Sequence, residues 1–120
     1  MTDERDQRYL SYIQDSIELI QRRTADGRAA FLNNVDAQDA VLWRLETLAE
    51  ATGKLSQEIK DRHPHIRWRA VYGFRNIATH GYLGLQLDLV WEIIEIHLPS
   101  LKVVVDEELD RSRQERDRPQ

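Results

Sequence analysis

The residues that this chain lacks set the first limits on its class. Its 120 residues include no cysteine, one methionine, three prolines and five glycines. Without cysteine, neither a disulfide nor a thiolate metal site can form. No apolar run approaches the roughly 18 residues of a membrane-spanning helix. The opening residues, M-T-D-E-R-D, are charged and lead into no apolar signal-peptide core. We therefore expect a soluble, cytoplasmic protein that forms one domain with its own core.

The apolar pattern is that of an all-α protein. Apolar residues recur at helical spacing throughout, and no stretch alternates as a half-buried strand would. We expect an up-and-down bundle of four to five helices over residues 1–109. The tail, residues 110–120, reads D-R-S-R-Q-E-R-D-R-P-Q and is expected to be frayed or disordered, because it cannot pack a core.

Cap and turn residues divide the bundle into helices. Thr2 or Asp3 can cap the first helix, Gly27 marks its end, and Pro64 breaks the chain near its middle. After Gly27 we expect a short turn within 28–34 and then a helix that is capped by Asn34 or Asp36 and weakened at Gly53. Ser56 is expected to cap a short continuation of that helix. Three further helices are expected over 66–79, 87–98 and 99–109, the last with Pro99 at its first position.

Positive charge is concentrated in one part of an acidic chain. The whole chain carries −4, whereas residues 60–82 hold five Lys/Arg and a single acid, so that segment carries +4 and the remainder −8. Three of the four histidines also lie there. The segment is either a solvated helix face or a surface for an anion such as RNA, and Arg67 and Arg69 are candidate RNA-binding residues.

The helix expected over 66–79 has two contrasting faces. At 100° per residue, Arg75 and His80 lie about 140° apart and flank a strip along which a phosphate could lie. Asn76 is four residues before His80, so their side chains can meet. Gly81 offers a break that would let Tyr82 turn back toward this side. The opposite face is expected to enter the core with Ala70, Val71, Phe74, Ile77 and Ala78.

These residue types suit RNA cleavage without a metal ion or another cofactor. Histidine can transfer a proton near neutral pH. Arginine stays charged and binds phosphate oxygens, where negative charge builds in the transition state. One histidine per chain is few for both acid and base catalysis, which favours a two-fold dimer that brings two motifs together. Asn76 could orient the imidazole or a phosphate.

Three other features allow further interpretations. His63 and His65 do not have a recognised metal-ligand spacing, and Arg67 nearby disfavours a cation, so we expect no metal site. Glu46 and Glu50 lie four apart on one helix, as a carboxylate pair, a solvated pair or a dimer-facing pair would. The tryptophans at 43, 68 and 91 suit a core or an interface better than a base-stacking platform.

The stretch R-N-I-A-T-H-G-Y, residues 75–82, resembles the R-x4-H-x-Y motif of HepT-type toxins, the DUF86 branch of the HEPN superfamily. Arg75, His80 and Tyr82 match its defining positions, and Asn76 matches the asparagine that commonly follows the arginine. Ala78 and Thr79 replace a bulkier apolar pair. The resemblance extends in order to F-L-N-N at 31–34, L-E-T-L-A-E-A at 45–51, P-H-I-R-W-R at 64–69 and V-W-E-I-I…L-P-S-L at 90–101.

This resemblance implies an all-α HEPN-like bundle that forms a two-fold homodimer, with a cleft at the interface. It implies a ribonuclease toxin with Arg75 and His80 as catalytic residues. Its partner is expected to be a minimal nucleotidyltransferase antitoxin of the MntA type, which adenylylates the motif tyrosine, here Tyr82. Trp68 and Tyr72 share the side of Arg75 and are expected to border the dimer interface. The alternative function is a non-catalytic module that binds a nucleotide or holds a nucleotidyltransferase.

Overall fold

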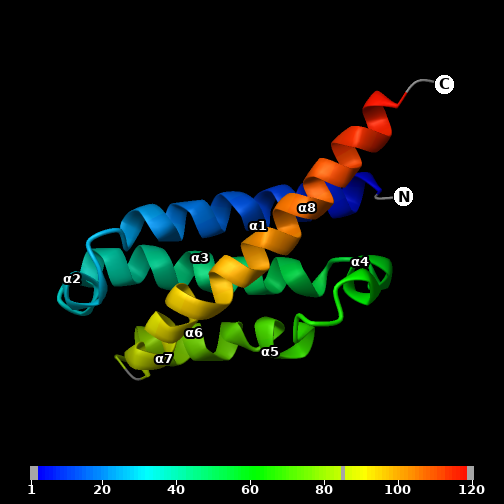
Figure 1. The fold of residues 1–120 in the computed structure, drawn as a ribbon. Helices are drawn as coiled ribbons and strands as arrows, with labels where there is room; N and C mark the ends of the chain where they lie inside the picture. The colour runs from blue at the N-terminus through cyan, green and yellow to red at the C-terminus, as the bar shows by residue number, and fades with distance from the viewer. Residues whose placement is uncertain (1–2, 85, 119–120) are drawn as a thin grey trace.

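Four helices set the architecture of the molecule. The computed structural model describes residues 3–84 and 86–118. α3 (Val35–Gly53) lies between α1 (Glu4–Arg23) on one side and α6 (Phe74–Tyr82) on the other, and α8 (Leu98–Asp117) crosses α1 (Figure 1). No strand occurs in the described ranges, so the all-α prediction is confirmed.

Short helical segments connect these four helices. The segments are α2 (Arg28–Leu32), α4 (Gln57–Arg62), α5 (Trp68–Tyr72), α7 (Leu87–Glu92) and the π-helical turn η1 (Ile93–His97). α5 packs against α3 beside α6, which places residues 68–82 of the basic segment along one side of α3. α7, η1 and α8 follow one another without a loop, and Pro99 is the second residue of α8, after Leu98, rather than the first residue of a separate helix.

The predicted N-caps explain where three helices begin. Asp3 of α1, Asn34 of α3 and Ser56 of α4 each accept a hydrogen bond from the backbone N–H three residues later, at 2.7, 3.0 and 3.4 Å. Asn34 is thus the cap, in preference to Asp36. Thr2, the other candidate for α1, lies outside the described residues.

The core is built from the apolar stripes of the three long helices. None of the described helices is both long and apolar enough to cross a membrane. The fully buried side chains include Leu10, Ile13, Ile17 and Ile20 of α1, Leu42, Leu45 and Leu48 of α3, and Leu98, Leu101 and Val105 of α8. On the predicted core face of the motif helix, Val71, Phe74 and Ala78 are buried, whereas Ala70 is exposed and Ile77 is only partly buried.

The prediction of one helix over 66–79 is wrong in two respects. The helix is divided at Gly73, and its second part, α6, continues to Tyr82. Glycine is the weakest helix former after proline, and at this position the Asn76 N–H bonds to the Gly73 carbonyl only three residues back, at 3.0 Å. The division leaves Arg75, His80 and Tyr82 together on α6.

The C-terminal part of α8 differs from the disorder expected of residues 110–120. The helix runs to Asp117, and Ser112 is buried, beside the side of α1 that carries Gln7 and Ser11. Composition alone did not reveal this contact with α1. Residues 119 and 120 lie outside the described residues, and the domain boundary at residue 109 stays a prediction.

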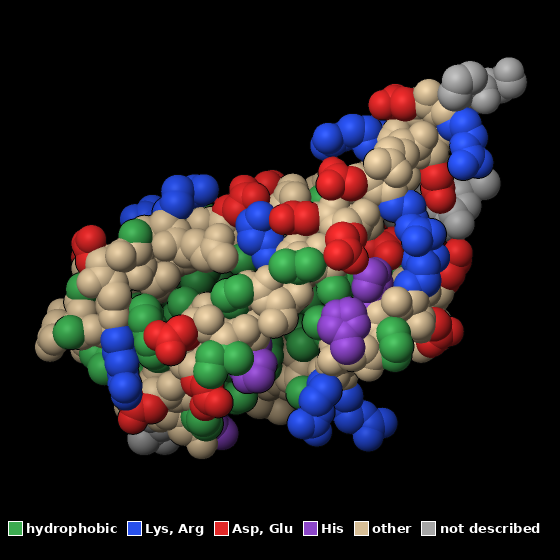
Figure 2. Space-filling model, viewed as in Figure 1, with side chains coloured by type: hydrophobic (Ala, Val, Ile, Leu, Met, Phe, Trp, Pro, Cys, Tyr) green, Lys and Arg blue, Asp and Glu red, His purple; other side chains and the backbone are tan. Residues whose placement is uncertain are grey.

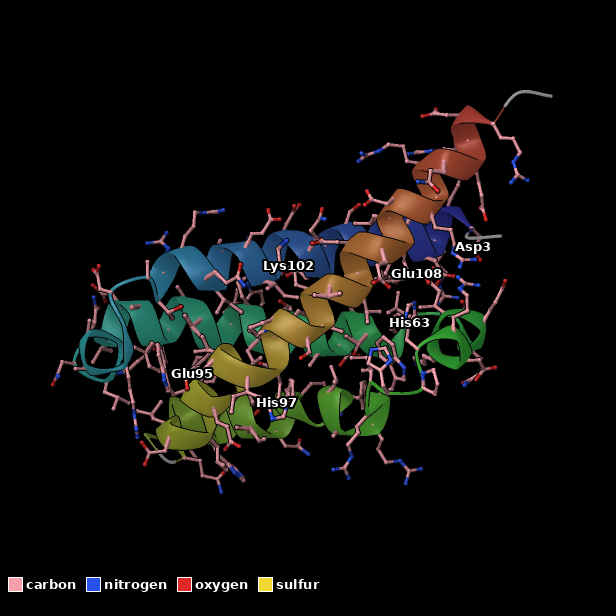
Figure 3. The ribbon with its side chains drawn as sticks, viewed as in Figure 1. Asp3, His63, Glu95, His97, Lys102 and Glu108 are labelled. Carbon is pink, nitrogen blue, oxygen red and sulfur yellow. The ribbon has the colours of Figure 1, made fainter. Side chains whose placement is uncertain are left out.

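A buried ionic cluster fastens α8 to the segment before the motif helix. Glu108, 1% exposed, accepts hydrogen bonds from Arg62 at 2.6 and 3.1 Å and lies 2.6 Å from His63 Nε2. Figure 3 shows Glu108 on α8 above His63. The His63 carbonyl in turn accepts from the indole N–H of Trp68 at 3.1 Å. His63 is therefore a structural partner of a carboxylate that lies 45 residues away in the chain.

Candidate functional site

The motif residues lie on two sides of one continuous helix. Seven residues at 100° each bring Tyr82 to within about 20° of Arg75 around the axis of α6, two turns further on. His80 lies about 140° from Arg75. One chain therefore places Arg75 and Tyr82 on a common side, and His80 on another.

Gly81 has a different role from the predicted one. It lies inside α6 and does not break it, so Tyr82 is not turned back toward His80. A Cβ atom built on Gly81 would lie 2.6 Å from Leu42 Cδ2 and 3.2 Å from Leu42 Cδ1. Because such contacts are too short for carbon atoms, glycine here allows α6 to approach α3 closely.

Arg75 is held by two groups. Its Nη1 donates to Glu50 Oε2 at 2.8 Å, and its guanidinium lies 4.1 Å from the centre of the Tyr72 ring. The ion pair and the cation–π contact fix the plane of the guanidinium. The Arg75 Nε–H is buried and has no hydrogen-bond partner among the described residues. The motif arginine is thus oriented while some of its five N–H donors stay unused.

His80 is exposed and interacts with Gln86. Its Nδ1 lies 3.1 Å from Gln86 Oε1. An amide oxygen only accepts, so this hydrogen bond requires the proton on Nδ1 and leaves the lone pair of the neutral ring on Nε2. Gln86 has φ +59°, a left-handed conformation that is unfavourable for a residue with a side chain. The site includes a strained residue that presents its amide to the motif histidine.

Asn76 lies on the surface between Arg75 and His80. At about 100° from Arg75 and 40° from His80 around the axis, it is exposed, and its side chain forms no hydrogen bond within the described residues. The predicted pairing of Asn76 with His80 is not what the structure contains, because the imidazole bonds to Gln86 instead. The amide of Asn76 is free to meet a ligand.

Tyr82 is half exposed at the end of α6. Its side chain lies at the α3 surface, with 45% of its area accessible. Burial raises the pKa of the Tyr82 phenol, and the negative charges of Glu46 and then Asp39 on α3 raise it further. The phenol is therefore protonated at neutral pH. An accessible O–H beside carboxylates can be modified once a base removes its proton.

Arg67 and Arg69 lie beside the motif rather than within it. Both are exposed, Arg69 within α5 and Arg67 as its N-cap. Figure 2 shows Lys and Arg side chains projecting from this part of the surface. In the described ranges, no group of three or more His, Cys, Asp or Glu residues is placed to hold a metal ion. His63 and His65 pack their rings 6.0 Å apart, and His63 is engaged by Glu108.

Sequence reasoning missed three partners of the motif. Glu50 was considered only as a carboxylate pair with Glu46, and Tyr72 only as an interface residue, yet together they hold Arg75. Gln86 gave no signal, because a glutamine in a left-handed conformation cannot be recognised from residue type. The motif helix itself contains no Asp or Glu, but carboxylates of α3 act on it: Glu50 pairs with Arg75, and Glu46 and Asp39 raise the pKa of Tyr82.

Comparison with known proteins shows the family of the chain. A sequence model of the family "Ribonuclease HepT-like" matches residues 13–108. The chain is similar to a "Probable ribonuclease HepT" of Thermococcus cleftensis, 34% identical over 95 residues that cover 78% of this chain and 86% of that protein. It is also similar to a "Gamma-glutamylcyclotransferase and putative RNase" of Methanocaldococcus jannaschii, 36% identical over 109 residues that cover 88% of this chain. This chain spans 49% of the length of that second relative. No solved structure matches the chain.

Proposed function

Because the chain belongs to the HepT-like ribonuclease family, we propose that it is an RNA endonuclease that requires no metal ion. The observation that carries this proposal is the surface of α6, where an oriented guanidinium and an accessible imidazole lie five residues apart with a free amide between them. Arg75 binds the scissile phosphate, Asn76 supports it, and His80 moves a proton. The proposed place of action is the cytoplasm.

The reaction needs only groups that the chain and the RNA supply. The ribose 2′-oxygen attacks the adjacent phosphorus, so that an O2′–P bond forms and the P–O5′ bond breaks. One base takes the 2′-hydroxyl proton and one acid protonates the leaving 5′-oxygen. The lone pair on His80 Nε2 suits the base, and Arg75 stabilises the charge on the non-bridging oxygens. In a homodimer, the second chain's motif supplies the acid.

Glu50 and Tyr72 keep Arg75 in place without occupying all of its donors. One N–H bonds to Glu50, and the ring of Tyr72 lies beside the guanidinium. A phosphate that approaches from the open side can still accept from the remaining N–H groups. Glu50 therefore orients the arginine before the substrate arrives, and an oriented charge loses less entropy when it binds.

Regulation is proposed to act on Tyr82 in a toxin–antitoxin module of the type VII kind. A nucleotidyltransferase antitoxin would transfer AMP from ATP: the phenol oxygen attacks the α-phosphorus, and pyrophosphate leaves. Because the pKa of Tyr82 is raised by burial and by Glu46 and Asp39, a base must take the phenolic proton during transfer. The attached phosphate would lie on the side of α6 that carries Arg75 and compete with RNA for it.

Purified protein mixed with a fluorescent single-stranded RNA tests the activity. Wild type should cleave it, and His80→Ala should lose about 10²–10⁴-fold in rate, the usual contribution of general acid–base catalysis. His65→Ala is the matched control, because His65 is also an exposed histidine but lies outside the motif. Light scattering should give a dimer. No cleavage by wild type above the rate of a protein-free sample would favour the alternative, a non-catalytic module whose Arg75 is partly neutralised by Glu50, and equal cleavage rates for wild type and His80→Ala would exclude His80 as a catalytic residue.

A further inference from the structure

A pocket of about 600 Å³ adjoins the motif, between the end of α3, α4 and α5. Its wall includes both groups that hold Arg75, the carboxylate of Glu50 and the ring of Tyr72. Trp68 and Arg69 of α5 contribute to the same wall. Arg75 itself does not line the pocket, but a ligand in it would lie beside the two residues that hold Arg75.

The charge of the pocket wall is positive although the chain as a whole is acidic. Lys54, Lys60 and Arg69 line it, and none of the three forms a salt bridge within the described part of the chain. The wall also contains two carboxylates, Glu50 and Asp61, so three positive and two negative charges give it a net charge of +1. Glu50 pairs with Arg75, and Asp61 accepts a hydrogen bond from Gln57 at 2.9 Å. Three cations without partners attract an anion.

The same wall offers two aromatic rings. Tyr72 is 36% exposed, and a Cβ atom on Gly53 would lie 2.5 Å from its Cε1 atom, so the absence of a side chain at Gly53 makes room for the ring. Trp68 is fixed by its N–H donating to the His63 carbonyl at 3.1 Å. Aromatic faces held beside cations are the usual means by which proteins bind single-stranded nucleic acid, because every base can stack on them.

We propose that this pocket binds one nucleotide of the RNA next to the scissile phosphate. The base stacks on Tyr72 or Trp68, and its phosphate meets Lys54, Lys60 and Arg69. The volume lies within the range of about 300–1,000 Å³ typical of small-ligand sites. This subsite rests on the proposed ribonuclease function, and it adds the place on the chain where one nucleotide of the RNA binds.

Binding of a single-stranded RNA decamer, labelled with fluorescein, tests the subsite by fluorescence anisotropy. The His80→Ala background prevents cleavage. Adding Lys60→Ala and Arg69→Ala should weaken binding about tenfold or more and reduce the dependence of log Kd on log salt by about 0.7 per lost phosphate contact. Arg22→Ala with Arg23→Ala is the matched control, since both are exposed arginines at the far end of α1, and it should change Kd by less than about twofold.

Three outcomes would overturn the subsite: equal Kd for the pocket variant and its parent, equal losses in the pocket and control variants, or equal affinity for the decamer and an abasic ribose-phosphate strand of the same length. Circular dichroism and thermal melting establish that the variants fold. In the cleaving background, the pocket variant should raise KM with little change in kcat. If the wild type does not cleave RNA but binds it through the pocket, the ribonuclease function fails and the nucleotide site stands.

Discussion

Glu108→Gln should destabilise the fold by breaking the ionic cluster between α8 and the residues before the motif. The carboxylate is 1% exposed and contacts Arg62 and His63, at distances of 2.6–3.1 Å. Removing one partner of a buried ion pair costs about 3–5 kcal/mol. Arg62 keeps Glu58 as a partner at 3.1 Å and is partly exposed, so we expect the lower end, about 3 kcal/mol.

The thermal midpoint, measured by circular dichroism, should fall by roughly 10 °C for a domain of this size. Glu107→Gln is the matched control, because the neighbouring carboxylate on α8 is exposed. It should shift the midpoint by no more than about 2 °C, as surface substitutions usually change stability by under about 0.5 kcal/mol. Equal shifts of the thermal midpoint in the two variants would refute the conclusion that the cluster stabilises the packing of α8.

The same cluster predicts how stability depends on pH. Burial acts to raise the pKa of Glu108, but the hydrogen bonds and charges of Arg62 and His63 more than offset it, so the pKa lies below its ordinary value of 4.5. A lowered carboxyl pKa contributes stability above the unfolded-state value and loses it as pH falls through the folded-state value. The gap in free energy of unfolding between wild type and Glu108→Gln should therefore narrow below about pH 4.5.

Three further substitutions test the surroundings of α6. Gly81→Ala should lower the thermal midpoint, because the added Cβ would lie 2.6 Å from Leu42 and overpacking of about 1–3 kcal/mol outweighs the gain of about 1 kcal/mol in helix propensity. The second substitution Leu42→Val should restore the midpoint. A raised midpoint in Gly81→Ala alone would contradict the close packing of α6 on α3. Gln86→Glu places a carboxylate beside the His80 imidazole and stabilises its charged form, so the acidic limb of the cleavage rate should move up by about one pH unit; an unmoved limb would exclude His80 as the base. Tyr82→Phe should keep most cleavage activity and yet resist silencing by a co-expressed nucleotidyltransferase, with intact mass showing AMP on the wild type alone; silencing of both would mean that the partner acts by binding.

Much of the fold follows from local sequence signals. Asp3, Asn34 and Ser56 cap their helices because an N-cap depends on one side chain and its own next turn. The apolar stripes of α1 and α3 are equally local, since helical periodicity alone places them on one face. The helical end of α8 could not be predicted, because Ser112 is buried by contact with a helix about 100 residues earlier in the chain.

In the candidate site, too, local features were predicted from the sequence and contacts between distant residues were not. The motif predicts Arg75, His80 and Tyr82 on or beside one helix, and the structure places them on α6. Their partners depend on tertiary structure: Glu50 is 25 residues from Arg75 in sequence, and Gln86 reaches His80 through a left-handed backbone. The role of Gly81 was predicted wrongly because a glycine signals either a break or a close approach, and only the neighbouring Leu42 distinguishes them.

Mass spectrometry of the RNA ends, after digestion in excess EDTA, tests the central claim most directly. The proposed attack is by the ribose 2′-hydroxyl, and no metal ion takes part in it. The account predicts cleavage that EDTA leaves unchanged, with 2′,3′-cyclic phosphate and 5′-hydroxyl ends, and about a hundredfold less of these products, or lower, from His80→Ala in the same time. Activity lost in EDTA, with 5′-phosphate and 3′-hydroxyl ends in its absence, would contradict it.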